Sequence, residues 1–122
     1  MSLITPSPFI SKNRIIENKY AFSIYDSYPV SNRHSLVIPK SEVKSIFELS
    51  SNEYIGCFDL VKELKNYLEK EYKCQGFNIG INNGVAAGQT VYHAHIHLIP
   101  RYDNDMESPR GGIRKIFPNS DY

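Results

Sequence analysis

Three of the four histidines in the chain stand at alternate positions, His93, His95 and His97, and the fourth, His34, lies far upstream. Successive side chains of a β-strand point to opposite faces, so a strand through this stretch projects the three imidazoles to one side. A neutral imidazole, with a reference pKa of about 6.5, can attack phosphorus and form a phosphoramidate that water later cleaves. The histidine row therefore indicates nucleophilic chemistry at a phosphate.

A metal site is the main alternative, because imidazole is a common zinc ligand. At about 3.3 Å of rise per residue, the Cα atoms of His93 and His97 lie about 13 Å apart, whereas one zinc needs every ligand nitrogen at about 2.0–2.1 Å. Two histidines of the row could share a metal with His34 or Asp26, but hardly all three. A purely structural role is difficult to reconcile with three histidines in register on one face.

A small, glycine-rich segment, residues 83–90, precedes the row. Such a loop lets backbone N–H groups approach a ligand closely. The Gln89 amide and the Thr90 hydroxyl add donors that could meet the charge on non-bridging phosphate oxygens. No metal is obligatory in this scheme, although a divalent metal could accompany the substrate phosphates.

The surrounding pattern predicts a sheet and one long helix. Ser50 and Glu53 have capping-box spacing, and apolar residues then recur every three to four positions up to residue 72. Strands are predicted at residues 15–16, 20–25, 35–38, 76–82 and 91–102. These elements indicate an α+β fold with a mostly antiparallel sheet, the helix on one face and the histidines on the other.

Size and composition exclude several classes of protein. The 122 residues fit a single domain, and a formal net charge of +1 argues against a general nucleic-acid binder. No apolar run approaches the roughly 18 residues of a membrane span, and the first residues do not resemble a signal peptide. We therefore expect a cytoplasmic protein with no membrane partner, in which Cys57 and Cys74 are reduced thiols.

The segment His93-Ala94-His95-Ile96-His97-Leu98-Ile99 resembles the His-φ-His-φ-His-φ-φ signature of the histidine triad (HIT) superfamily. This superfamily includes nucleoside phosphoramidate hydrolases and dinucleoside polyphosphate hydrolases. The resemblance covers roughly residues 15–102 and includes further matched positions, namely Gly88-Gln89-Thr90-Val91, Asn82, Asp26 and the segment from His34 to Pro39.

The resemblance implies roles in catalysis for the histidines. His95 would be the nucleophile that becomes nucleotidylated. His97 would contact the α-phosphate and help to orient His34, while His93 would support the position of His95.

It also implies roles in binding. Gln89 and Thr90 would hold phosphate or leaving-group oxygens, Asp26 would hydrogen-bond the ribose hydroxyls, and Asn82 would contact ribose or phosphate. Apolar residues near Phe9, Phe22 and Ile24 would line the base pocket or belong to the core.

The implied protein is a homodimeric HIT hydrolase with one long helix and a short helix on one face of the sheet. An irregular arm of residues 1–8 and a tail of residues 103–122 would flank the domain. The enzyme would cleave a nucleoside 5′-phosphoryl bond, with purine substrates favoured, and release a nucleoside monophosphate. A nucleotide-binding adaptor, a nucleotidyl transferase and a metal-dependent hydrolase remain alternatives.

The chain also departs from the family pattern. Many bacterial relatives carry an N-terminal zinc-binding cysteine pair, and this sequence has none, so we expect no structural zinc. The basic segment of residues 110–115 resembles the ends of bacterial HIT hydrolases. Its arginines would reach distal phosphates or a partner subunit, or would simply be surface charge.

Overall fold

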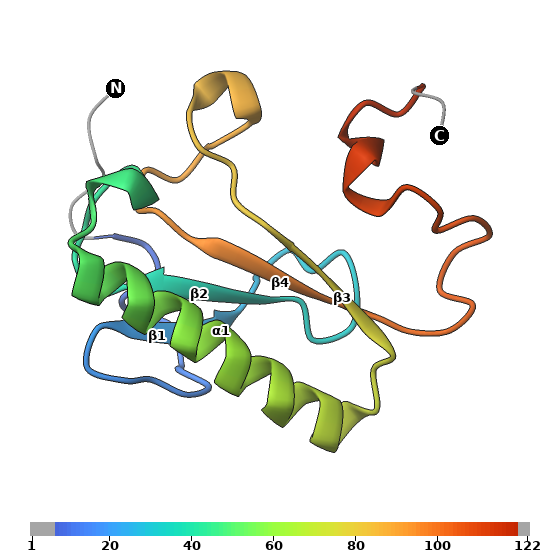
Figure 1. Cartoon of the computed structure of the whole chain (residues 1–122), viewed down its shortest axis with the longest axis horizontal. Helices are drawn as coiled ribbons and strands as arrows, with labels where there is room; N and C mark the ends of the chain where they lie inside the picture. Colours follow the sequence, from blue (N-terminus) through green and yellow to red (C-terminus); the bar gives the residue numbers. More distant parts are fainter. Residues whose placement is uncertain (1–6, 120–122) are drawn as a thin grey trace.

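The computed structural model of the chain describes residues 7–119, so most of the predicted N-terminal arm lies outside the described residues. The described part contains one four-stranded sheet, one long helix and three short 3₁₀ helices (Figure 1). The strands are β1 (Ala21–Tyr25), β2 (Ser35–Pro39), β3 (Gly76–Gly80) and β4 (Ile96–Arg101); the helices are α1 (Ser51–Tyr72), η1 (Ile46–Glu48), η2 (Val85–Ala87) and η3 (Gly112–Ile116). The sheet has the order β1-β2-β4-β3 with every neighbouring pair antiparallel, which confirms the predicted α+β class.

The predicted capping box begins α1. The Glu53 backbone N–H donates to Ser50 Oγ over 3.3 Å, and the Ser50 backbone N–H donates to Glu53 Oε1 over 2.9 Å. These bonds satisfy two donors that a helix start leaves unpaired. The helix ends where Lys73 takes a left-handed conformation with φ of 54°. The predicted short helix is the single turn η1, whose Ile46 is buried in the core.

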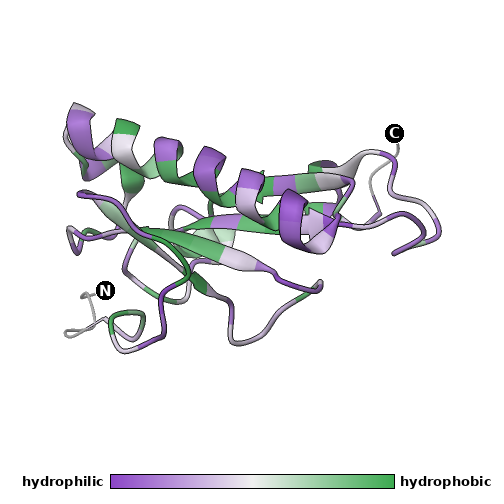
Figure 2. Cartoon of the chain, turned by 90° about the horizontal axis from the view of Figure 1, so that it is seen from below, coloured by the Kyte–Doolittle hydropathy of each residue, from purple (hydrophilic) through white to green (hydrophobic). Residues whose placement is uncertain are grey.

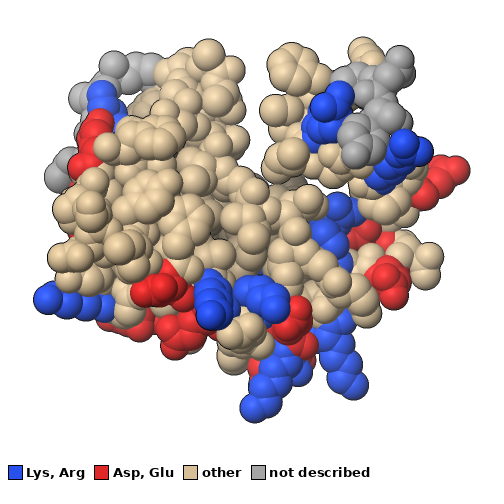
Figure 3. All heavy atoms as spheres, viewed as in Figure 1, with Lys and Arg blue, Asp and Glu red and all other residues tan. Residues whose placement is uncertain are grey.

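The apolar stripe of α1 forms the core against one face of the sheet. Its fully buried members include Leu60, Leu64 and Leu68, which pack against Val37 and Ile96 of the sheet. Figure 2 shows the helix covering this face, and charged side chains gather along its outer side (Figure 3). No helix in the described residues is both long and apolar enough to cross a membrane.

A glycine lets α1 approach the turn before β1. A Cβ at Gly56 would lie 2.7 Å from the Tyr20 side chain, so only glycine fits this contact without a shift. The Gly56 carbonyl also accepts a hydrogen bond of 2.9 Å from the Asn18 amide. This contact fixes the helix against the edge of the sheet.

Strand lengths differ from the prediction at three places. Residues 91–95 precede β4 rather than belonging to it, because the Ala94 N–H donates to the Val43 carbonyl over 2.7 Å instead of joining the sheet ladder. The strand predicted for residues 76–82 ends at Gly80. Residues 15–16 bond to Ser23 but form no regular strand.

Candidate active site

The sheet face opposite α1 carries the candidate site, and the strand register fixes its layout. Ile24 of β1 lies opposite Leu36 of β2, and Leu36 lies opposite His97 of β4. His34 directly precedes β2 and Asp26 directly follows β1, where the Asp26 N–H donates to the His34 carbonyl over 2.8 Å. The histidines therefore lie toward β4, and apolar side chains cover the face toward β1.

A cavity of about 550 Å³ opens on this face, within the range of small-molecule sites. Every candidate site residue predicted from the sequence lines it except His93. The polar lining comprises Asp26, His34, Asn82, Gln89, Thr90, His95 and His97, and the apolar lining includes Phe9, Ile24, Leu36 and Val91. Phe22, the third residue predicted near the base, belongs to the core instead.

His95 is held in one tautomer by its own chain. Its Nδ1 lies 2.7 Å from the His93 carbonyl oxygen, which can only accept, so Nδ1 carries the proton. The Nε2 atom of the neutral ring therefore keeps its lone pair. Burial lowers the pKa of His95, which maintains the neutral, nucleophilic ring at neutral pH.

Hydrogen bonds also fix the tautomers of His34 and His97, which contact each other. The Val30 N–H donates to His34 Nδ1 over 3.1 Å, so the proton of neutral His34 is on Nε2. This Nε2–H donates to His97 Nδ1 over 2.9 Å, which leaves the proton of His97 on its Nε2. His97 can then offer an N–H donor to a ligand in the cavity.

Electrostatics keep this pair neutral as well. Burial lowers the pKa of His97 to about 4, and the neighbouring His95 and His34 reinforce the effect against the opposing carboxylate of Asp26. Burial also lowers the pKa of His34, again opposed by Asp26. Neutral imidazoles offer an anionic ligand hydrogen bonds rather than fixed positive charge.

The first histidine of the row corrects the expectation of three imidazoles facing a substrate together. His93 is 1% exposed, and its Nε2–H donates to the Pro39 carbonyl over 2.7 Å. Its Nδ1 accepts from the Ser7 hydroxyl over 2.6 Å. Its ring packs against Phe9 and Phe22, so His93 points to the same sheet face as His95 but is covered there by other side chains. Through its carbonyl, His93 holds His95 and acts as a positioning residue.

Gln89 also departs from its expected role as a phosphate donor. Its side-chain amide donates to the carbonyls of Lys44 over 2.9 Å and Val91 over 3.0 Å, and its Oε1 accepts from the Gly84 N–H over 2.9 Å. Both amide hydrogens are therefore used within the protein. Gln89 ties down the glycine-rich loop, whose Gly84 and Gly88 have φ of 98° and 92°.

One group in the described residues has the spacing for a metal ion. The nearest ligand atoms of Asp26, His34 and His97 all lie within 4.8 Å of one another. Of the histidine row only His97 takes part, fewer than the two that the Cα spacing would allow. The amide bond from Val30 places the proton of His34 on Nε2, the nitrogen that a metal would need, so the hydrogen bonding favours a proton at this position.

Sequence reasoning missed Ser7, which lies in the arm, and Lys12, which follows the arm. Ser7 orients His93, and Lys12 lines the cavity. Neither belongs to a periodic pattern, and only their contacts with distant parts of the chain identify them. The basic tail, by contrast, supplies no lining residue of this cavity; η3 packs beside β3, and Lys115 donates to the Ser108 carbonyl over 2.7 Å (Figure 1).

Comparisons with known proteins agree with this geometry. A family model described as HIT domain matches residues 8–104. A solved HIT family protein from Bacillus anthracis shares 31% sequence identity and a TM-score of 0.73, with 93% of this chain and 90% of that chain covered.

Two named relatives have similar sequences. Adenylylsulfatase HINT3 of Arabidopsis thaliana is 35% identical over 92 residues, which are 75% of this chain and 47% of the relative. The asymmetrical bis(5′-nucleosyl)-tetraphosphatase of Schizosaccharomyces pombe is 40% identical over 78 residues, which are 64% of this chain and 43% of the relative. The chain thus spans about half the length of each of these curated relatives.

Proposed function

The chain belongs to the HIT family, and from this membership and its histidine site we propose that it is a nucleotide hydrolase working through a covalent nucleotidyl-histidine intermediate. Its substrate would be a nucleoside phosphoramidate or a dinucleoside polyphosphate. The observation that carries the proposal is the tautomer of His95, which leaves an unprotonated Nε2 in a cavity that can hold a nucleotide.

Hydrolysis takes two displacements at the α-phosphorus. The His95 Nε2 lone pair forms a bond to phosphorus while the bond to the leaving group breaks, and the leaving group departs with its electron pair and takes up a proton. Water then attacks phosphorus, the N–P bond breaks, and a nucleoside monophosphate leaves. The Nδ1–H bond to the His93 carbonyl persists throughout and stabilises the positive charge that the ring gains on attack.

His97 acts on the phosphate oxygens. Its Nε2–H donates to a non-bridging oxygen, whose charge grows in the transition state. His34 holds the ring of His97 in the required tautomer, and Asp26 lies 3.4 Å from the same His34 nitrogen. When ionised, the Asp26 carboxylate accepts hydrogen bonds and donates none, which suits the donor hydroxyls of a ribose.

The nucleoside lies across the sheet in this proposal. Its base packs on the apolar lining near β1, and Asn82 contacts ribose or phosphate from the opposite wall. The names of the two relatives, an adenylylsulfatase and a bis(5′-nucleosyl)-tetraphosphatase, support a nucleotide substrate. We also propose a homodimer and a purine preference on family grounds.

Product analysis tests the reaction class. The chain is incubated with an AMP phosphoramidate and with a series of dinucleoside polyphosphates, and the products are identified by mass spectrometry. We expect a nucleoside monophosphate from at least one substrate and, for His95→Ala, a loss of at least about 10³-fold in kcat. Full turnover by His95→Ala contradicts the mechanism, and tight AMP binding without any cleavage by the wild type indicates the adaptor.

A further inference from the structure

Lys12 is the only lysine or arginine among the described residues that line the cavity, and the proposed chemistry does not use it. It sits in a turn in which its N–H donates to the Phe9 carbonyl over 3.2 Å. Its side chain is exposed, and its ammonium has no partner among residues 7–119. The cavity therefore contains one uncommitted positive charge.

The path of the chain shows on which side of the cavity this charge lies. Just after Lys12, the Arg14 guanidinium stacks 4.2 Å from the Phe22 ring centre, and the Ile15 N–H donates to Ser23 over 2.8 Å. Both partners belong to β1, whereas His97 belongs to β4, and β2 separates the two strands. Lys12 thus enters from the β1 side, away from the imidazole of His97.

This inference rests on the proposed function, in which the base of the nucleotide lies on the β1 side of the cavity. With phosphorus at His95, the apolar surface available to the base includes Phe9, Ile24 and Leu36, and the last two pair across β1 and β2. Apolar surface offers no hydrogen bonds and so cannot distinguish one purine from another. The Lys12 ammonium offers three donors and no acceptor.

We propose that Lys12 reads the edge of the base and selects 6-oxopurine nucleotides, those of guanine or hypoxanthine, over adenine nucleotides. A 6-oxopurine presents O6 and N7 as adjacent acceptors, which suit an ammonium group. Adenine replaces O6 with an amino group, a donor that cannot bond to a second donor. A contact of this kind discriminates between bases by about 5-fold to 100-fold.

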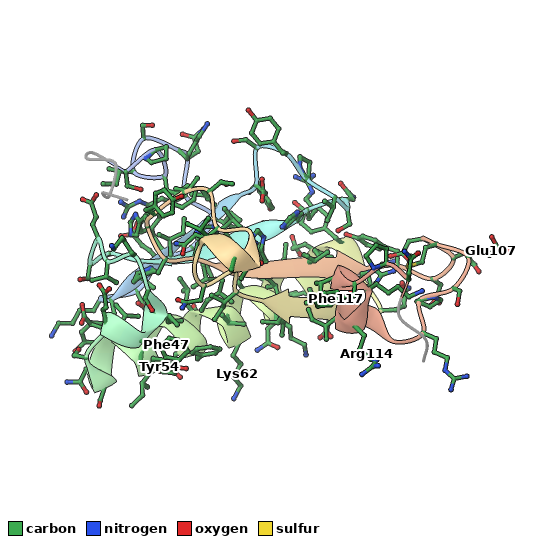
Figure 4. The ribbon with its side chains drawn as sticks, turned by 90° about the horizontal axis from the view of Figure 1, so that it is seen from above. Phe47, Tyr54, Lys62, Glu107, Arg114 and Phe117 are labelled. Carbon is green, nitrogen blue, oxygen red and sulfur yellow. The ribbon has the colours of Figure 1, made fainter. Side chains whose placement is uncertain are left out.

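The test compares kcat/KM for the 5′-phosphoramidates of guanosine, inosine and adenosine, which share one leaving group. The wild type is expected to prefer guanosine and inosine over adenosine by at least about 5-fold. In Lys12→Met, which keeps the aliphatic stem, the ratio falls to about 1. Lys62→Met is the matched control, because Lys62 projects from the outer face of α1 away from the sheet (Figure 4), and its ratio stays at the wild-type value.

Three results would overturn the proposal. The first is a wild type that shows no base preference, and the second is a preference for guanosine that inosine does not share. The third is an equal loss of kcat/KM for all three substrates in Lys12→Met, which would place the Lys12 charge at the phosphates. Should no phosphoramidate be cleaved, calorimetric titration of GMP, IMP and AMP into the wild type and Lys12→Met measures the same ratios by binding alone. The binding ratios therefore test the base selectivity of Lys12 even if the proposed hydrolysis does not occur.

Discussion

His93 and His97 are four positions apart in one histidine run, and their surroundings differ in kind. His93 precedes the regular strand and is enclosed, with one ring nitrogen bonded to Pro39 and the other to Ser7. His97 lies within β4, uses one nitrogen for His34 and has a second that faces no protein partner in the described residues. Hydrogen-bond partners, rather than spacing, therefore separate a structural imidazole from a reactive one.

Replacing His97 tests the reactive histidine of this comparison and should give a larger effect than replacing His93 or Ser7. His97→Ala removes an N–H donor to the phosphate and the acceptor for His34. We expect kcat to fall by about 10²–10³-fold, as when one transition-state donor is lost. Steady-state kinetics measure this loss, and thermal unfolding provides the control. A variant with wild-type kcat would show that the open nitrogen has no catalytic use.

Replacing His93 tests whether its enclosed ring stabilises the fold. His93→Ala leaves the Pro39 carbonyl and the Ser7 hydroxyl without their partner and opens a cavity beside Phe9 and Phe22. The free energy of unfolding should fall by about 2–4 kcal/mol. Urea denaturation measures the change. If His93→Ala unfolds at the wild-type urea concentration, the enclosed ring does not stabilise the fold and the comparison fails.

The pH dependence of stability tests the burial of His93 and His97 together. Burial lowers the folded-state pKa of His97 from 6.5 to about 4 and also lowers that of His93, so the unfolded chain binds more protons between pH 4 and 6.5. Stability present above pH 6.5 is therefore lost as the pH falls through this window, by about 2–3 kcal/mol from His97 alone.

Urea unfolding at pH 7.5 and pH 5 measures this loss. His97→Asn should show a weaker dependence on pH, because it removes one of the shifted groups. Greater stability at pH 5 than at pH 7.5 would contradict the assignment of neutral, buried imidazoles.

Replacing Ser7 should give the smallest of these effects. Ser7→Ala removes the hydroxyl that donates to His93 Nδ1 but leaves the His93 ring in place. We expect a loss of about 1–2 kcal/mol in the free energy of unfolding, smaller than for His93→Ala. The double variant with His93→Ala should lose less than the sum, since both changes remove the same bond. Additive losses would mean that the two residues act independently.

The local parts of this protein could be predicted from sequence. The capping box of α1 and its apolar stripe depend on residues three or four positions apart, and both were confirmed. The placement of His95 and His97 at one cavity also follows from a short alternating run.

The rest depends on contacts between distant residues. His93 is enclosed by Ser7 and Pro39, which lie 86 and 54 positions away, and Gln89 is bound by Lys44, 45 positions away. Alternation alone could not reveal these partners, so the enclosure of His93 and the internal hydrogen bonds of Gln89 were not predicted. Lys12 was missed because residues 7–14 show no periodicity that would place this side chain beside β1.

Detection of the covalent intermediate tests the central claim most directly. Excess chain is mixed with an AMP phosphoramidate, quenched in alkali, in which an N–P bond survives, and examined by intact-protein and peptide mass spectrometry. We predict an increase equal to one adenylyl group on the peptide that contains His95, and none in His95→Ala. Turnover without any adduct, or an adduct on a different residue, would contradict the account.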